Sequence, residues 1–221
     1  MSLPLSSSPW TMARWLVIAP HPDDETLGAG ALIAETARSG RLHGIVYLTD
    51  GTGSHPPGTA GLARARQREA GHALHRLGGD RSMIDCLGWK DANPHPRDGL
   101  EFRRAAQRLG AWLRDRRIDA IAVSDVQEHH CDHVAAWHLA QAAIRHARRG
   151  VTLFSYHVWG TAPGEACRRY HTCRMPPARR RQALRAHRSQ LSPLFGDGFR
   201  LDTRTQRMPA ADCLTLRRRL S

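Results

Sequence analysis

The sequence contains almost no lysine: of its 33 basic residues, only Lys90 is not an arginine. With 20 acidic residues the net charge is +13, which by itself would suggest a nucleic-acid-binding protein. An excess confined to arginine is more typical of a genome-wide codon preference than of selection for a basic patch. Aromatic residues are also scarce, at 6%, and they do not alternate with the arginines as stacking platforms for nucleic acid would. We therefore expect no nucleic-acid partner and keep nucleic-acid binding as the alternative function.

Long apolar runs and a cysteine pattern are missing too. No stretch approaches the length of a membrane span, so no transmembrane segment is expected. The five cysteines are odd in number and unpatterned, which indicates free thiols in a reducing compartment and favours the cytoplasm. Residues 1–13 have neither the basic start nor the apolar centre of a signal peptide, and we expect them to be a disordered leader.

What remains is the composition of a globular protein with one domain. The 221 residues are 41% apolar and 24% charged, enough to bury a sizeable core. Predicted strands cover residues 15–19, 44–49, 83–89, 120–124 and 151–156, and predicted helices about 25–39, 62–77, 100–116, 134–149 and 178–191. This alternation predicts an α/β fold, a Rossmann-like three-layer sandwich with a mostly parallel sheet. Residues 201–221 form a tail to which we assign no role.

The first predicted strand leads directly into a cluster of polar residues. His21 and Asp24 are three apart where the turn enters the helix, so their side chains can converge. Imidazole nitrogen and carboxylate oxygen together suit a divalent metal such as zinc. Asp23 should point elsewhere, where a base for a metal-bound water would be needed. The simpler interpretation is that Asp23 or Asp24 only caps the helix.

A second cluster follows the fourth predicted strand. Residues 125–133 contain His129, His130, Asp132 and His133 between that strand and the next helix. One histidine from this turn would complete three protein ligands and leave a fourth position for water, as in catalytic zinc sites. The two turns lie side by side if the first and fourth strands are neighbours, with the metal site at their carboxyl ends.

Both clusters match motifs of one family. Residues 19–25, Ala-Pro-His-Pro-Asp-Asp-Glu, match the signature of the PIG-L/LmbE-like family of zinc-dependent N-deacetylases. Residues 130–133 resemble the family's His-Pro-Asp-His motif, with Cys131 in place of proline. Weaker similarities lie at residues 48–51, 66–69, 77–78, 156–160 and 183–190. The resemblance covers residues 14–200, which we interpret as a PIG-L/LmbE-like deacetylase domain.

This resemblance implies a metal-dependent amidohydrolase that removes an N-acyl group, with N-acetyl expected, from an amino sugar or its conjugate. Its ligands would be His21, Asp24 and His133, and its cofactor Zn²⁺, with Fe²⁺ as another candidate. Asp23 would take the proton of the attacking water. The residue spacing alone predicts only a hydrolytic metal centre. A structural metal protein without turnover, or a nucleic-acid binder with a degenerate metal site, would be the alternatives.

Four further residues have roles implied by the resemblance. His130 would lie beside the metal and stabilise the oxyanion as an imidazolium, and Asp132 would orient His130 and raise its pKa. Arg66 resembles a substrate-holding arginine, although it also fits a solvated basic helix face. Asp91 matches a position that holds a sugar hydroxyl.

Two features would distinguish this chain within the family. Cys131 removes the backbone constraint of proline, and its thiol, although beside the metal, should point away from it. Substrate choice should come from loops 50–60, 90–98 and 161–177. The third loop contains Arg168, Arg169 and Arg174, which suit a small-molecule substrate with an anionic group. The alternative is that these residues belong to the chain-wide arginine excess. The oligomeric state is not predictable from these features.

Overall fold

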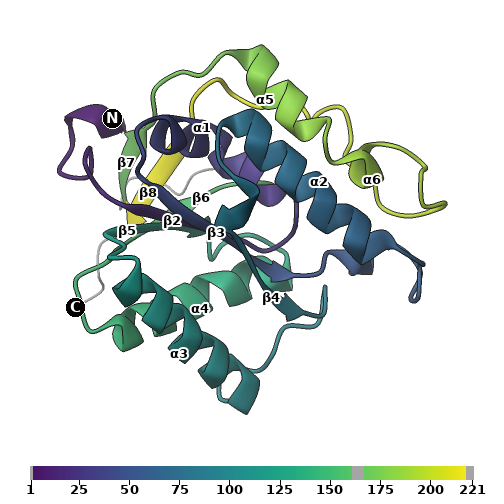
Figure 1. Cartoon of the computed structure of the whole chain (residues 1–221), viewed down its shortest axis with the longest axis horizontal. Coiled ribbons are helices and arrows are strands. Elements are labelled where there is room, and N and C mark those ends of the chain that lie inside the picture. The colour runs from purple at the N-terminus through teal and green to yellow at the C-terminus, as the bar shows by residue number, and fades with distance from the viewer. Residues whose placement is uncertain (1, 161–166, 218–221) are drawn as a thin grey trace.

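The computed structural model describes residues 2–160 and 167–217. Within them, eight strands form a single sheet in the order β1-β7-β8-β6-β5-β2-β3-β4 (Figure 1). The strands are β1 (Ser2–Pro4), β2 (Trp15–Ala19), β3 (Leu42–Thr49), β4 (Ile84–Trp89), β5 (Ala120–Ser124), β6 (Thr152–Tyr156), β7 (Cys167–His171) and β8 (Cys213–Arg217). β8 runs antiparallel to β6 and β7, while all other neighbours are parallel. The predicted, mostly parallel α/β sheet is confirmed.

Helices cover both faces of this sheet (Figure 1). They are α1 (Asp24–Arg38), α2 (Leu62–Leu77), α3 (Leu100–Asp115), α4 (Cys131–Ala147), α5 (Pro177–Leu184) and α6 (Arg188–Leu191), with short 3₁₀ helices η1 (Leu5–Ser7), η2 (Thr52–Ser54) and η3 (Arg81–Met83). Because strand side chains alternate, Val17 packs in the core with α1, α2 and α5, whereas Leu16 and Ile18 pack with α3 and α4. β2 and β5 are buried on both faces, as their continuous apolar sequences predict.

The sheet has its switch point at β2. β3 lies on one side of this strand and β5 on the other, both parallel to it. The turns that follow β2 and β5 therefore emerge side by side at the carboxyl edge, the place where open α/β sheets bind ligands. This is the neighbour relation that the sequence prediction required.

The two ends of the chain differ from the prediction. Residues expected to form a disordered leader add β1 to the edge of the sheet, where Ser2 pairs with Arg169. Leu5 is buried, and Trp10 packs edge-on against Phe154. The expected tail supplies β8, which lies between β6 and β7 and buries Leu214. Both segments therefore belong to the core sheet, because their apolar side chains and backbone groups complete it.

Three helical regions also differ in detail. The expected helix 178–191 is two helices, α5 and α6, because the chain turns His187 into the interior, 3.1 Å from Glu25. α4 begins at Cys131, so that His133 lies in its first turn. The loop expected at 161–177 contains β7, and its residues 161–166 lie outside the described part. Among the described helices, none combines the length and hydropathy of a membrane span.

Candidate metal centre and active site

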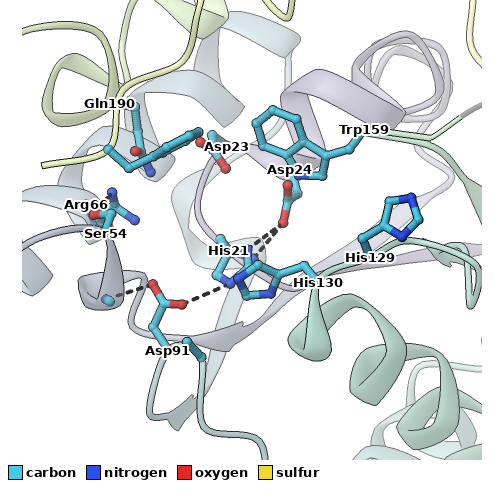
Figure 2. A pocket seen from close by; sticks show the side chains of 13 residues that line it. His21, Asp23, Asp24, Ser54, Arg66, Asp91, His129, His130, Trp159 and Gln190 are labelled. Atoms are coloured by element: carbon cyan, nitrogen blue, oxygen red, sulfur yellow. Dashed lines mark hydrogen bonds and ion pairs between the residues drawn. The ribbon is translucent and has the colours of Figure 1, made fainter.

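The turn after β2 has an unusual backbone at Asp23. This residue has φ 139° and precedes α1 as its N-cap, with its carbonyl accepting from the amides of Thr26 and Leu27. Such a conformation is strained for a residue with a side chain, and strain of this kind gathers at functional sites. The Asp23 side chain makes no capping hydrogen bond, so the simpler capping interpretation does not describe it. Asp23 instead lines the cavity beside Asp24 (Figure 2).

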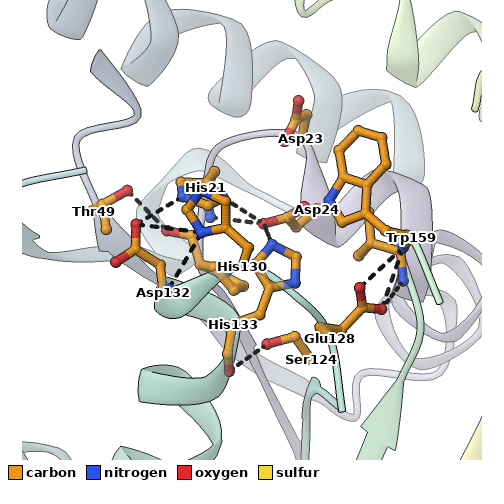
Figure 3. A network of polar contacts seen from close by, with 12 residues as sticks. His21, Asp23, Asp24, Thr49, Ser124, Glu128, His130, Asp132, His133 and Trp159 are labelled. Atoms are coloured by element: carbon orange, nitrogen blue, oxygen red, sulfur yellow. Dashed lines mark hydrogen bonds and ion pairs between the residues drawn. The ribbon is translucent and has the colours of Figure 1, made fainter. Parts of the chain in front are cut away.

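Asp24 lies against both of the predicted histidine ligands. Asp24 Oδ2 lies 3.1 Å from His21 Nδ1 and 3.3 Å from His133 Nε2 (Figure 3). Ligands of a tetrahedral zinc ion, with bonds of about 2.0–2.2 Å, are about 3.3–3.5 Å apart, so these two spacings are close to those of coordinated atoms. Both ring nitrogens of His133 are buried without a hydrogen bond, and a metal ion would satisfy Nε2, the nitrogen that faces Asp24. The residues present therefore fit a divalent metal.

The charges of this cluster also favour a cation. Burial opposes ionisation of Asp24, but His133 and His21 outweigh it and hold the pKa of Asp24 well below its usual range. Burial would lower the pKa of His21, yet hydrogen bonds with Asp132, Asp24 and Asp91 raise it well above its usual value. A positive charge is thus stabilised where the carboxylates gather.

Asp23 has the properties of a proton acceptor near neutral pH. It is 5% exposed, and burial together with the neighbouring Asp24 raises its pKa to about 7, although His187 and Arg66 oppose the shift. A base is most effective when its pKa lies near the working pH. The position and the pKa of Asp23 therefore suit the predicted base.

Asp132 has a different partner from the one predicted. Its Oδ2 accepts from His21 Nε2 at 3.0 Å and from the Ala92 amide at 2.8 Å, whereas His130 Nδ1 lies 3.8 Å away (Figure 3). The carboxylate therefore orients the metal ligand His21, a common arrangement around bound metals. The expectation that Asp132 mainly orients His130 is not what the structure shows.

His130 is also in a different state from the one expected. Burial and the nearby His21 lower its pKa, and Asp132 raises it without outweighing them. Its Nδ1 accepts a 3.3 Å hydrogen bond from the Asp132 amide, so the neutral ring carries its proton on Nε2. The lowered pKa and the accepting Nδ1 favour a neutral ring, so the structure does not support the imidazolium that the resemblance implies.

Two other groups of possible ligands overlap the predicted one. Among the described residues, metal-ligating atoms lie within 4.8 Å of one another in His21, His130 and His133, and in His21, Asp91, His130 and Asp132. Neither group includes Asp24. The carboxylates of Asp91, Asp132 and Asp24 all accept a backbone hydrogen bond, so these bonds do not distinguish them, and the set His21, Asp24 and His133 stays a prediction.

The cluster opens into a cavity of about 470 Å³. Arg66, 1% exposed, lines it and donates from Nη2 to Ser54 Oγ at 2.8 Å. Asp91 also lines it, with Oδ2 accepting from the Gly53 amide at 2.8 Å and Oδ1 lying 3.2 Å from His21 Nε2. Both predicted substrate-binding residues thus lie at the cavity, on the side of loop 50–60 (Figure 2).

The opposite wall was not predicted. Trp159 and Phe199 contact each other edge to face, with ring centroids 5.9 Å apart, and both line the cavity. The backbone amide of Trp159 donates to the carboxylate of Glu128, at 3.2 Å to Oε2, and that of Phe199 to Ser54 O at 2.8 Å. Gly53, Ser54 and Ala92 also line the cavity and come from loops 50–60 and 90–98, which were expected to set substrate choice. His129 and Gln190 line it as well. Phe199 comes from sequence with no ligand-binding pattern around it, and only the fold brings it here.

The residues expected to distinguish this chain within the family do not line the cavity. Cys131 occupies the first position of α4, where proline is also favoured, and its exposed side chain joins neither possible ligand group in the described residues. Arg168 and Arg169 lie in β7 and, like Arg174, are absent from the residues around the cavity. The expectation that these arginines read an anionic substrate is therefore wrong for the described part of the chain.

The fold and the site define an α/β protein with a His–Asp–His cluster, an adjacent buried carboxylate and an open cavity at the switch point. The family model for GlcNAc-PI de-N-acetylase, PIG-L, matches residues 16–144, more than half of the chain. The chain belongs to the PIG-L family. No curated protein sequence gives a significant match.

Solved structures with the same fold differ in function. The N,N'-diacetylchitobiose deacetylase of Pyrococcus horikoshii has 24% identity and a TM-score of 0.65, over 84% of this chain and 74% of that one. A conserved protein of Thermus thermophilus has 30% identity and a TM-score of 0.60, over 81% and 80%. The 4-carboxy-2-hydroxymuconate hydratase GalB of Pseudomonas putida has 15% identity and a TM-score of 0.59, over 94% and 98%. The fold alone therefore does not determine the reaction, and the site must.

Proposed function

We propose that this protein is a metal-dependent hydrolase that removes an N-acyl group, N-acetyl foremost, from an amino sugar or amino-sugar conjugate. The observation that carries the proposal is the convergence of His21 Nδ1, Asp24 Oδ2 and His133 Nε2 beside the buried carboxyl of Asp23. Three ligands with a neighbouring base suit hydrolysis, while a structural metal site would leave Asp23 without a role. Membership of the PIG-L family supports the amide bond as the one cleaved.

His21, Asp24 and His133 would hold the ion, Zn²⁺ first and Fe²⁺ as another candidate. Once bound, the ion supplies Lewis-acid polarisation of the amide carbonyl and makes a water molecule nucleophilic. Asp132 accepts the Nε2 proton of His21, which would leave the electron pair of Nδ1 free to bind the ion on the side where Asp24 lies. Asp132 thereby sets the tautomer of His21.

Asp23 moves the proton in this proposal. Its carboxylate takes a proton from the attacking water and returns it to the leaving amine, so that one residue serves both steps. Its pKa of about 7 suits both directions of transfer. His130, neutral and at the cavity, donates from Nε2 to the oxygen of the tetrahedral intermediate.

The walls of the cavity suit a sugar ring. Arg66, Ser54 and Asp91 offer polar groups on one side, where ring hydroxyls can bond, and Trp159 with Phe199 offers apolar faces on the other. A pyranose has the same division, with hydroxyls at its edge and C–H groups on its faces. The buried guanidinium of Arg66 lines the cavity. We propose Arg66, in place of Arg168 and Arg169, as the contact for an anionic substituent of the substrate.

A deacylation screen tests the proposal. Purified protein would be incubated with N-acetylglucosamine, N,N'-diacetylchitobiose and aryl N-acetylglucosaminides, with release of primary amine as the readout. We expect release that disappears in His21→Ala and persists in the control His72→Ala, whose side chain is exposed on α2. Steep salt-dependent binding to nucleic acid without amine release would instead support the alternative function.

A further inference from the structure

Helix α1, which begins with the proposed ligand Asp24, is broken at Ala29. The backbone angles there are φ −131° and ψ 15°, outside the helical region. The segment before the break is little more than one turn long, too short to hold its own direction. A helix kinks where a side chain enters its hydrogen-bond ladder, and the contacts of this segment show which side chains do so.

Arg180 of α5 binds the segment before the break. It is 2% exposed, and it donates from Nε to Thr26 O at 2.9 Å and from Nη2 to Leu27 O at 2.6 Å. Its Nη1 donates to Pro209 O at 2.9 Å. A cation at the carboxyl end of a helical segment is electrostatically favourable, and here it occupies the last carbonyls of the turn that carries Asp24.

Asp212, just before β8, binds the segment after the break. Its Oδ2 accepts from the Leu32 amide at 2.8 Å, and the Ala31 amide also bonds this carboxylate. The carboxylate thus acts as an N-cap for the second segment. Its Oδ1 lies 2.6 Å from Arg180 Nη1, and both side chains are almost fully buried. One ion pair therefore joins the two halves of the broken helix.

The neighbouring helix α6 reaches the same turn. His187, next to α6, lies 3.1 Å from Glu25, and Gln190 Nε2 donates to Pro22 O at 3.4 Å. Together with Arg180, these contacts from residues 180–190 surround residues 22–27, the turn and first helical residues around Asp23 and Asp24. Figure 1 shows α5 and α6 on the α1–α2 side of the sheet.

We propose that Arg180 and Asp212 are positioning residues for the metal centre. They set the direction of the first turn of α1, and with it the places of Asp23 and Asp24 relative to His133 on α4. The proposal rests on the proposed function for its catalytic consequence, but its effect on metal binding does not depend on which bond is cleaved. Buried ion pairs are not required for stability as such, since apolar replacements are often equally stable, so a geometric role accounts for this pair better.

The test compares Arg180→Lys and Asp212→Asn with the control Arg179→Lys, a neighbouring arginine of α5 whose side chain is half-buried and donates to Arg76 O. Zn²⁺ affinity would be measured by chelator competition, kcat and KM by amine release, and folding by circular dichroism and thermal unfolding. We expect Zn²⁺ affinity and kcat to fall about 10- to 100-fold in the two variants, with KM nearly unchanged, because small displacements of ligands and base are costly. Folded variants with control-like affinity and kcat would overturn the proposal.

A double variant, Arg180→Met with Asp212→Leu, covers the case in which a single variant does not fold. It leaves no buried charge unpaired and should therefore fold. We expect it to bind Zn²⁺ at least about 10-fold more weakly than the wild type, while wild-type affinity would contradict a positioning role. Should the wild-type protein bind Zn²⁺ and release no amine from any substrate, the proposed function fails, and the affinity comparison still decides the role of the pair.

Discussion

Two buried groups of charged residues meet the first turn of α1, and they differ in how completely their atoms are bonded. In the Arg180–Asp212 pair, each guanidinium nitrogen lies against a backbone carbonyl or the carboxylate. In the His21–Asp24–His133 cluster, His133 Nε2 lies 3.3 Å from Asp24 Oδ2, a longer contact than the 2.6 Å between Arg180 Nη1 and Asp212 Oδ1, and His133 Nδ1 has no hydrogen bond. Buried polar groups are nearly always bonded, so the looser cluster suits residues that bind a ligand, and the tighter pair suits support.

Replacement of Asp23 by asparagine should have the largest effect on turnover. The amide cannot accept a proton from water, and general base catalysis contributes about 10²- to 10⁴-fold. We expect kcat to fall by that factor while Zn²⁺ content stays at the wild-type level, because Asp23 is not among the ligands. Loss of metal together with activity would show that Asp23 belongs to the coordination sphere.

Unfolding free energies should differ between variants of the two buried groups. Asp212→Ala leaves Arg180 buried without its carboxylate, and we expect the free energy of unfolding to fall by about 3–5 kcal/mol. His133→Ala removes only the longer contact of Nε2 with Asp24 Oδ2, at 3.3 Å, so metal-free protein should lose clearly less. Denaturant unfolding of both variants without metal measures the difference, and equal losses would mean that the two groups are alike.

Asp132→Asn should weaken metal binding more modestly. The amide can still accept from His21 Nε2 but loses the negative charge that fixes the ring, and such replacements cost about 10- to 100-fold in affinity. Asp98→Asn, in an exposed loop, is the matched control. Chelator competition should separate the two variants, and identical affinities would argue against the role that the structure gives Asp132.

Trp159→Ala should have the smallest effect, confined to substrate binding. An aromatic contact contributes about 0.5–1.5 kcal/mol, so KM should rise a few-fold to about tenfold with kcat retained. Trp112→Ala, on the half-buried surface of α3, is the control. A fall in kcat without a change in KM would place Trp159 in the chemistry and not in the wall.

The approach of His21, Asp24 and His133 was predictable from two short motifs. His21 and Asp24 are fixed by one turn, and the apolar strands before the two turns predict that His133 joins them at the same sheet edge. The partner of Asp132 was not predictable, because it depends on distances between two turns and not on the pattern within one.

The cavity wall and the ends of the chain were likewise not predictable from local sequence patterns. Trp159 follows β6 and Phe199 lies between α6 and β8, and no local periodicity encodes the contact of their rings or the pairing of β8 with β6 and β7. β1 is three residues long, too short for a period-2 signal. The cavity wall and the edge strands therefore depend on contacts between segments that are distant in the sequence.

We propose that His21, Asp24 and His133 hold a catalytic metal. Elemental analysis of the purified protein and of His133→Ala, with His72→Ala as control, tests this assignment. We predict about one divalent ion per chain in the wild type and in the control, near-complete loss of the ion in His133→Ala, and loss of amine release along with it. A wild-type protein that carries no divalent ion even after incubation with Zn²⁺ or Fe²⁺, or a His133→Ala variant with unchanged metal content, would contradict the account.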